Sequence, residues 1–140
     1  MVKKYKTSCA IVINDKGQVI LIKRGRKPFK GLWGLISGIG ESKKGFEPEI
    51  GIIEEVNCDL QTESFKGKRL FSALVRNDKY TDEIVVFEGK VNENEIKVRP
   101  PFSVDYKWVS EKDMDSLGKL AFEHKKILEK YFRLLGLKST

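Results

Sequence analysis

The segment Leu32–Leu60 reads LWGLISGIGESKKGFEPEIGIIEEVNCDL, and the rest of the chain is interpreted around it. It joins a short apolar strand to a glycine-containing loop. Pro48 then suits the first position of a helix that we expect to run to about Val56. Two adjacent acids, Glu54 and Glu55, lie near the end of this helix. Neighbouring carboxylates repel each other, so their position beside an apolar run is one that a bound cation would explain.

Composition sets the class of protein. The 140 residues carry a formal net charge of +7, from 27 Lys and Arg against 20 Asp and Glu. Such a balance attracts anions such as nucleotides or nucleic acid, but composition alone favours the simpler explanation that the lysines keep the protein soluble. Cys9 and Cys58 lie far apart, and we expect both to be reduced thiols in a cytoplasmic protein. Apolar runs are too short to span a membrane, and we expect one domain over residues 1–140.

Alternating and β-branched runs predict six strands and two further helical segments. The predicted strands are Ser8–Ile13, Val19–Arg24, Leu32–Ile36, Phe65–Arg76, Ile84–Val91 and Val104–Val109. We expect the first two to form a hairpin and the fourth and fifth to pair antiparallel. Ser110 with Asp113 indicates a capped short helix, Leu120–Leu135 has the spacing of an amphipathic helix, and Asn57 is expected to cap the central helix. These elements indicate an α+β or α/β sandwich around a mixed sheet.

Carboxylates around the central segment are the candidate metal ligands. Glu41, Glu54 and Glu55 offer the oxygen atoms that Mg²⁺ prefers, and phosphate oxygens of a substrate would complete the coordination. Glu47 is a further acid, but it lies about 10 Å from Glu54 along a helix axis, so one ion would not easily use both. The sequence therefore favours a divalent cation at the end of the helix.

Other residues are weaker candidates. Trp33 offers a ring for stacking on a base, although a tryptophan at a strand end is more often part of the core. Gly38-Ile39-Gly40 is a weak pattern for a phosphate-binding loop. His124, the only histidine, lies among charged residues, and we expect it to be exposed.

The central segment resembles the Nudix box, in which Gly, five residues, Glu and seven residues precede Arg-Glu-apolar-any-Glu-Glu-any-Gly-apolar. Glu54–Cys58 matches the last part, with Asn57 in place of Gly. The order of the other elements is similar to that family as well. The matching segments are Val19–Arg24, Leu32–Leu35, Tyr106–Ser110 and Phe122–Leu135. The resemblance covers nearly the whole chain and implies a Nudix-like α/β/α sandwich around a mixed β-sheet.

The box departs from the family pattern at its centre. Ile50 and Gly51 stand where Arg and Glu are expected, so the family's usual acid at that place is absent. Ile36-Ser37-Gly38 stands where Pro-Gly-Gly is expected, and the spacing from Gly38 to Glu54 is two residues shorter than in the family pattern. Two alignments remain open, with either Glu41 or Glu47 at the first glutamate of the box.

The resemblance implies hydrolysis of a nucleoside diphosphate linked to another group, with Mg²⁺ or Mn²⁺ as cofactor. Glu54 and Glu55 would take part in catalysis as metal ligands, and Glu83 would be the base from outside the box. Lys23 and Arg24 would hold phosphate oxygens, since the arginine fork binds two oxygens at once. Trp33 and Gly38 would complete the substrate site. The alternative is a catalytically impaired module that binds a nucleotide or RNA, and either protein would be a monomer or a homodimer.

Overall fold

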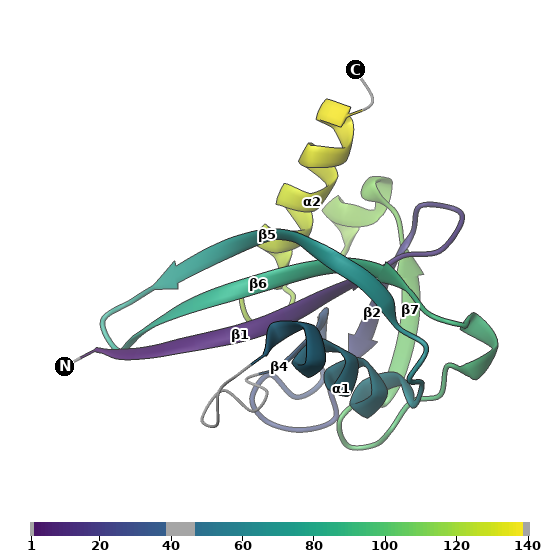
Figure 1. Cartoon of the computed structure of the whole chain (residues 1–140), viewed down its shortest axis with the longest axis horizontal. Helices are drawn as coiled ribbons and strands as arrows, with labels where there is room; N and C mark the ends of the chain where they lie inside the picture. The colour runs from purple at the N-terminus through teal and green to yellow at the C-terminus, as the bar shows by residue number, and fades with distance from the viewer. Residues whose placement is uncertain (1, 39–46, 139–140) are drawn as a thin grey trace.

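The computed structural model describes residues 2–38 and 47–138 of the chain. Four strands precede the first α-helix, and three further strands lie between the two α-helices (Figure 1). The strands are β1 (Lys3–Val12), β2 (Val19–Lys23), β3 (Trp33–Gly34), β4 (Ile36–Gly38), β5 (Lys66–Arg76), β6 (Tyr80–Lys90) and β7 (Asp105–Val109). The α-helices are α1 (Pro48–Leu60) and α2 (His124–Lys138), and the short 3₁₀ helices are η2 (Glu93–Glu95) and η3 (Glu111–Ser116).

The strands form two sheets. The larger sheet has the order β4-β1-β6-β5 and is mixed, because β1 runs parallel to β6 while the other pairs are antiparallel. The smaller sheet has the order β3-β2-β7 and is antiparallel. The predicted antiparallel pairing of β5 with β6 is confirmed, and so is the mixed sheet.

The predicted hairpin of the first two strands is wrong. β1 and β2 meet only through an isolated bridge between Ile13 and Val19, and they then enter different sheets. Both faces of β2 from Val19 to Ile22 are buried, with at most 2% of each residue exposed. β3 and β7, which come from later parts of the chain, bond to β2 instead of β1.

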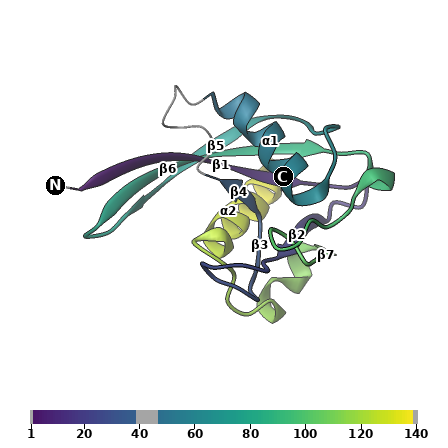
Figure 2. The same ribbon diagram turned by 90° about the horizontal axis from the view of Figure 1, so that it is seen from below.

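One helix covers each face of the larger sheet (Figures 1 and 2). Successive side chains of a strand point to opposite faces. Cys9 and Ile11 of β1 therefore pack on the α2 side, whereas Ala10 and Val12 pack on the α1 side. This arrangement confirms the predicted α/β/α sandwich.

Both helices differ slightly from their predicted bounds. Pro48 begins α1 as expected, but the helix continues to Leu60, and the left-handed residue that ends it is Gln61 rather than Asn57. The longer helix buries Leu60 in the core, which compensates for the low helix propensity of Asn57. The capping box of Ser110 and Asp113 is confirmed at η3. No helix in the described part of the chain is long and apolar enough to cross a membrane.

Candidate active site

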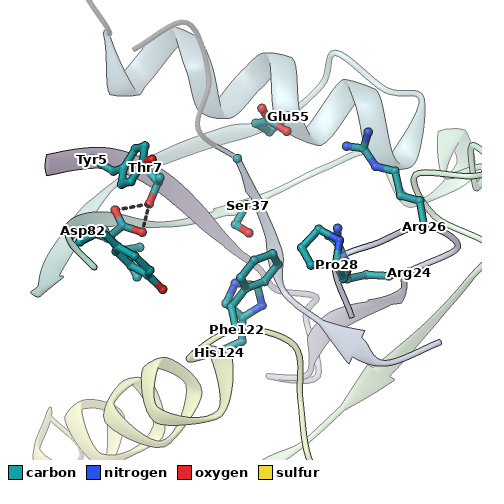
Figure 3. A pocket seen from close by; sticks show the side chains of 13 residues that line it. Tyr5, Thr7, Arg24, Arg26, Pro28, Ser37, Glu55, Asp82, Phe122 and His124 are labelled. Atoms are coloured by element: carbon teal, nitrogen blue, oxygen red, sulfur yellow. Dashed lines mark hydrogen bonds between the residues drawn. The ribbon is translucent and has the colours of Figure 1, made fainter. Parts of the chain in front are cut away.

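A cavity of about 500 Å³ opens beside β4, at the edge of the larger sheet (Figure 3). Its walls come from β1, β4, β6, α1, the loop that follows β2 and the turn that precedes α2. A volume of this size accommodates a small molecule. The cavity therefore brings together segments that are far apart in the sequence.

Glu55 provides an acidic group in this cavity. Its carboxyl group lies so close to the backbone of β4 that a Cβ atom on Gly38 would overlap it. Burial raises the pKa of Glu55, Arg26 lowers it, and the neighbouring Glu54 raises it. Among the described residues no hydrogen bond to the Glu55 carboxylate is found.

A second carboxyl group lies one helical turn further along α1. Asp59 is only 7% exposed. Its burial and the charge of Glu55 raise its pKa to about 7, although Arg24, Arg26 and Arg99 oppose the shift. Glu55 and Asp59 thus lie on the same edge of α1, and Asp59 is close enough to three arginines for their charges to interact. The pattern of adjacent acids in the sequence indicated Glu55 but not Asp59.

Two arginines form the cationic wall of the cavity. The Nε atom of Arg24 donates a hydrogen bond to the Pro28 carbonyl at 2.7 Å, and its guanidinium lies 5.1 Å from the centre of the Phe122 ring. The guanidinium of Arg26 lies 4.1 Å from the centre of the Phe102 ring. Ring contacts restrict both side chains, and the hydrogen bond restricts Arg24 further, which lowers the entropy cost of binding an anion.

His124 is buried, and the prediction that it is exposed is wrong. Its Nδ1 atom accepts a hydrogen bond from the Leu35 amide at 3.0 Å. Burial and the nearby charge of Arg24 lower the pKa of His124 to about 3. The ring is therefore neutral at physiological pH, with its hydrogen on Nε2, and it forms part of the cavity wall.

The opposite end of the cavity lies on β1 and β6. Thr7 Oγ1 donates to Asp82 at 3.0 Å from Oδ1 and 3.2 Å from Oδ2. The rings of Tyr5 and Tyr80 meet edge to face, with 5.8 Å between their centres. Figure 3 shows Tyr5, Thr7 and Asp82 on the side of the cavity away from Arg26.

Three of the residues predicted for the site line this cavity, namely Arg24, Gly38 and Glu55. Glu54 precedes Glu55 on α1 and is exposed. Glu41 lies outside the described residues. The structure thus brings one of the predicted metal ligands to the predicted phosphate-binding arginine.

The other predicted residues lie elsewhere. Lys23 ends β2, and Trp33 packs against the core on the α2 side beneath Lys107, whose Nζ is 4.3 Å from the ring centre. Glu83 forms an ion pair with Lys6 at 3.8 Å. Glu83 lies on the same face of β6 as Val85, which packs on the α1 side. Asp82 lies on the opposite face of β6 and lines the cavity. Lys23, Trp33 and Glu83 are absent from the described cavity walls.

Glu55 offers one carboxylate in the cavity for a Mg²⁺ ion that a substrate would help to hold. Within the described residues, no group of three or more His, Cys, Asp or Glu side chains is close enough to hold a metal ion by itself. Mg²⁺ commonly takes one or two carboxylates, with phosphate oxygens and water in its other positions. Glu55 supplies one such carboxylate in the cavity, whereas Glu54 is exposed and is not among the residues that line the cavity.

The comparison with known proteins decides the family. A family model of the NUDIX domain matches residues 3–131. The chain belongs to the NUDIX family. This NUDIX chain is 31% identical over 124 residues to a protein of Methanocaldococcus jannaschii named ADP-ribose pyrophosphatase, and the match covers 87% of this chain and 70% of the relative. The resemblance drawn from the sequence is confirmed.

Solved structures share the NUDIX fold. One is the NUDIX domain of Shewanella oneidensis NrtR in complex with ADP ribose, with a TM-score of 0.76, 20% identity and coverage of 96% of this chain and 90% of that chain. Another is the MutT protein of Methanosarcina mazei Go1, with a TM-score of 0.78, 19% identity and coverage of 94% of this chain and 95% of that chain. At these identities the likeness establishes the fold.

Proposed function

We propose that this NUDIX chain hydrolyses the pyrophosphate bond of a nucleoside diphosphate linked to a second group, and that ADP-ribose is the first substrate to test. The observation that carries the proposal is the meeting of Glu55, Arg24 and Arg26 in one cavity. A diphosphate carries negative charge that the two guanidinium groups neutralise. The name of the Methanocaldococcus jannaschii relative supports ADP-ribose in particular.

The arginines would bind the diphosphate. Arg24 already uses its Nε atom on the Pro28 carbonyl, so its two terminal NH₂ groups remain for phosphate oxygens. Arg26 and Glu55 line the same cavity, and the charge of Arg26 lowers the pKa of Glu55. A phosphate group bound by Arg26 would therefore also lie near the carboxylate of Glu55.

Glu55 and Glu54 would hold Mg²⁺ or Mn²⁺, and Glu41 remains a predicted further ligand. When bound, the ion supplies charge neutralisation on the phosphate oxygens and lowers the barrier to attack by water. Gly38 leaves the space that the Glu55 carboxyl group occupies. The role of this chain is therefore to present an acid next to a bound diphosphate.

The reaction consumes one water molecule. The water oxygen bonds to one phosphorus atom, the bond from that phosphorus to the bridging oxygen breaks, and two phosphomonoesters form. With ADP-ribose the products are AMP and ribose 5-phosphate. Glu83 is the base predicted from the sequence, and an unchanged kcat of Glu83→Gln would remove it from that role.

A second function is favoured by the centre of the box. Gly51 is buried and has no side chain where the family pattern has an acid. A cavity with two arginines binds a diphosphate whether or not hydrolysis follows. The alternative is therefore a module that binds a nucleotide and releases it unchanged.

The test combines binding with product analysis. Purified protein is incubated with ADP-ribose and Mg²⁺, and AMP is followed by chromatography, while calorimetry measures binding. We expect AMP to form with the wild type, and Glu55→Gln to abolish its formation. Glu111→Gln is the matched control, since Glu111 is an exposed acid of η3 outside the cavity. Binding without AMP formation, repeated over a panel of nucleotide sugars, dinucleoside polyphosphates and capped RNA, would support the binding module.

A further inference from the structure

The end of the cavity on β1 and β6 carries a hydrogen-bond acceptor that the proposed chemistry does not use. Asp82 faces the cavity, and it forms no ion pair with any described residue. Its hydrogen bond comes from Thr7, which lies on the neighbouring strand in the parallel pairing of β1 with β6. A half-buried carboxylate with a single neutral donor has room to accept hydrogen bonds from a ligand.

The position of Thr7 determines which ligand donors fit. Its Oγ1 atom lies at nearly equal distances from the two oxygens of Asp82, 3.0 and 3.2 Å. The hydroxyl group thus occupies the side of the carboxylate where two parallel N–H donors would otherwise bind. Lone pairs on the outer side of each oxygen remain free. Asp82 is therefore suited to one donor group and not to a pair of adjacent donors.

The surroundings of Asp82 suit a flat apolar ring. Tyr80 and Ile84 precede and follow it by two residues on β6, and all three line the cavity. Tyr5 packs edge to face on Tyr80. Aromatic side chains bind nucleobases by stacking on their faces. The charge needed for a diphosphate lies at the other end of the cavity, at Arg24 and Arg26 (Figure 3).

We propose that this end of the cavity binds the base of the nucleotide, and that Asp82 selects adenine by accepting a hydrogen bond from its exocyclic amino group. The inference rests on the proposed function for the placement of the diphosphate at the arginines. Hypoxanthine carries a carbonyl oxygen where adenine has the amino group, and that oxygen is repelled by the carboxylate. Guanine presents two adjacent donors, N1–H and N2–H, whose binding side on Asp82 is occupied by Thr7.

The experiment measures binding of nucleoside diphosphates by calorimetry, and no hydrolysis is followed. We expect the wild type to bind ADP about tenfold more tightly than IDP, which is typical of one hydrogen bond to a charged group. Asp82→Asn should remove or reverse this preference, because an amide can donate to the carbonyl oxygen of hypoxanthine. Asp78→Asn is the matched control on the exposed turn before β6, and it should keep the ratio of the wild type.

A second variant tests the role of Thr7 independently. Thr7→Ala removes both the hydroxyl group and its volume, which opens the side of Asp82 that spans its two oxygens to the paired donors of guanine. We expect its affinity for GDP relative to ADP to rise. Equal affinities of the wild type for ADP and IDP, or an unchanged ratio in Asp82→Asn, would overturn the inference. Loss of affinity for 2′-deoxy-ADP together with equal ADP and IDP affinities would also overturn it, since the sugar would then be the group recognised. Because binding alone is measured, a chain that binds but does not hydrolyse still tests this inference.

Discussion

His124 makes the stability of the fold depend on pH in a way that can be calculated. Its pKa is lowered to about 3 in the folded chain, by burial and by Arg24, from an ordinary value of 6.5. Between these two values the unfolded chain binds the proton and the folded chain does not. Stability is therefore lost as the pH falls from 6.5 towards 3. At about pH 5 the loss is about 2 kcal/mol, since each pH unit below 6.5 contributes about 1.4 kcal/mol.

Asp59 has an effect of opposite sign in the same range. Its pKa is raised from 3.8 to about 7, mainly by burial and then by Glu55. The folded chain therefore binds the proton more readily than the unfolded chain, and stability is lost as the pH rises from 3.8 to about 7. Acidification from about pH 7.5 to about pH 5 stabilises the fold by about 2 to 3 kcal/mol through Asp59. The opposite effects of His124 and Asp59 on the free energy of unfolding therefore nearly cancel in the wild type over this pH range.

The assay is urea unfolding of wild type and His124→Asn at about pH 7.5 and about pH 5. Asparagine keeps an oxygen that can accept from the Leu35 amide but does not titrate. We expect the free energy of unfolding of the wild type, relative to that of His124→Asn, to be about 2 kcal/mol lower at about pH 5 than at about pH 7.5. The chain has one histidine, so the difference between the two proteins isolates this group. Parallel pH profiles of the two proteins would refute the reasoning.

The remaining predictions concern the site and the core. Gly38→Ala should lower kcat/KM for ADP-ribose about tenfold or more, because its Cβ displaces the Glu55 carboxyl, and unchanged kinetics would contradict that contact. Arg26→Ala should weaken ADP binding about tenfold in calorimetry, whereas Arg69→Ala, outside the cavity, should not, and equal effects would argue against the cationic wall. Leu128→Ala should lower the free energy of unfolding in urea by about 2–5 kcal/mol, since this residue is fully buried, and a loss under about 1 kcal/mol would contradict its packing.

Local patterns predicted most of the fold. β5 and β6 were predicted to pair because a short polar connection joins two alternating runs, and the structure confirms the pair. β1 and β2 satisfy the same rule, yet they separate after the Ile13–Val19 bridge. β2 pairs instead with β3 and β7, and its own sequence does not indicate these partners.

The sequence predicted part of the site, and Glu55 shows one kind of evidence that it offered. Glu55 stood out as an acid beside an apolar run, and it lines the cavity. Asp82 and Glu83 are adjacent, and only the parallel register of β1 with β6 determines that Asp82 faces the cavity. His124 follows Leu120 by four residues and precedes Ile127 by three, so helical spacing indicated its burial, but the charged neighbours favoured exposure.

The central claim is that the Glu55 carboxylate and the arginines of this cavity act together to cleave a pyrophosphate bond. The most direct measurement is a ³¹P NMR time course of ADP-ribose with Mg²⁺ and the purified chain, with Glu55→Gln in parallel. We expect the diphosphate signals to be replaced by those of two phosphomonoesters with the wild type alone. Diphosphate signals that persist with the wild type, or that disappear equally fast with Glu55→Gln, would contradict the claim.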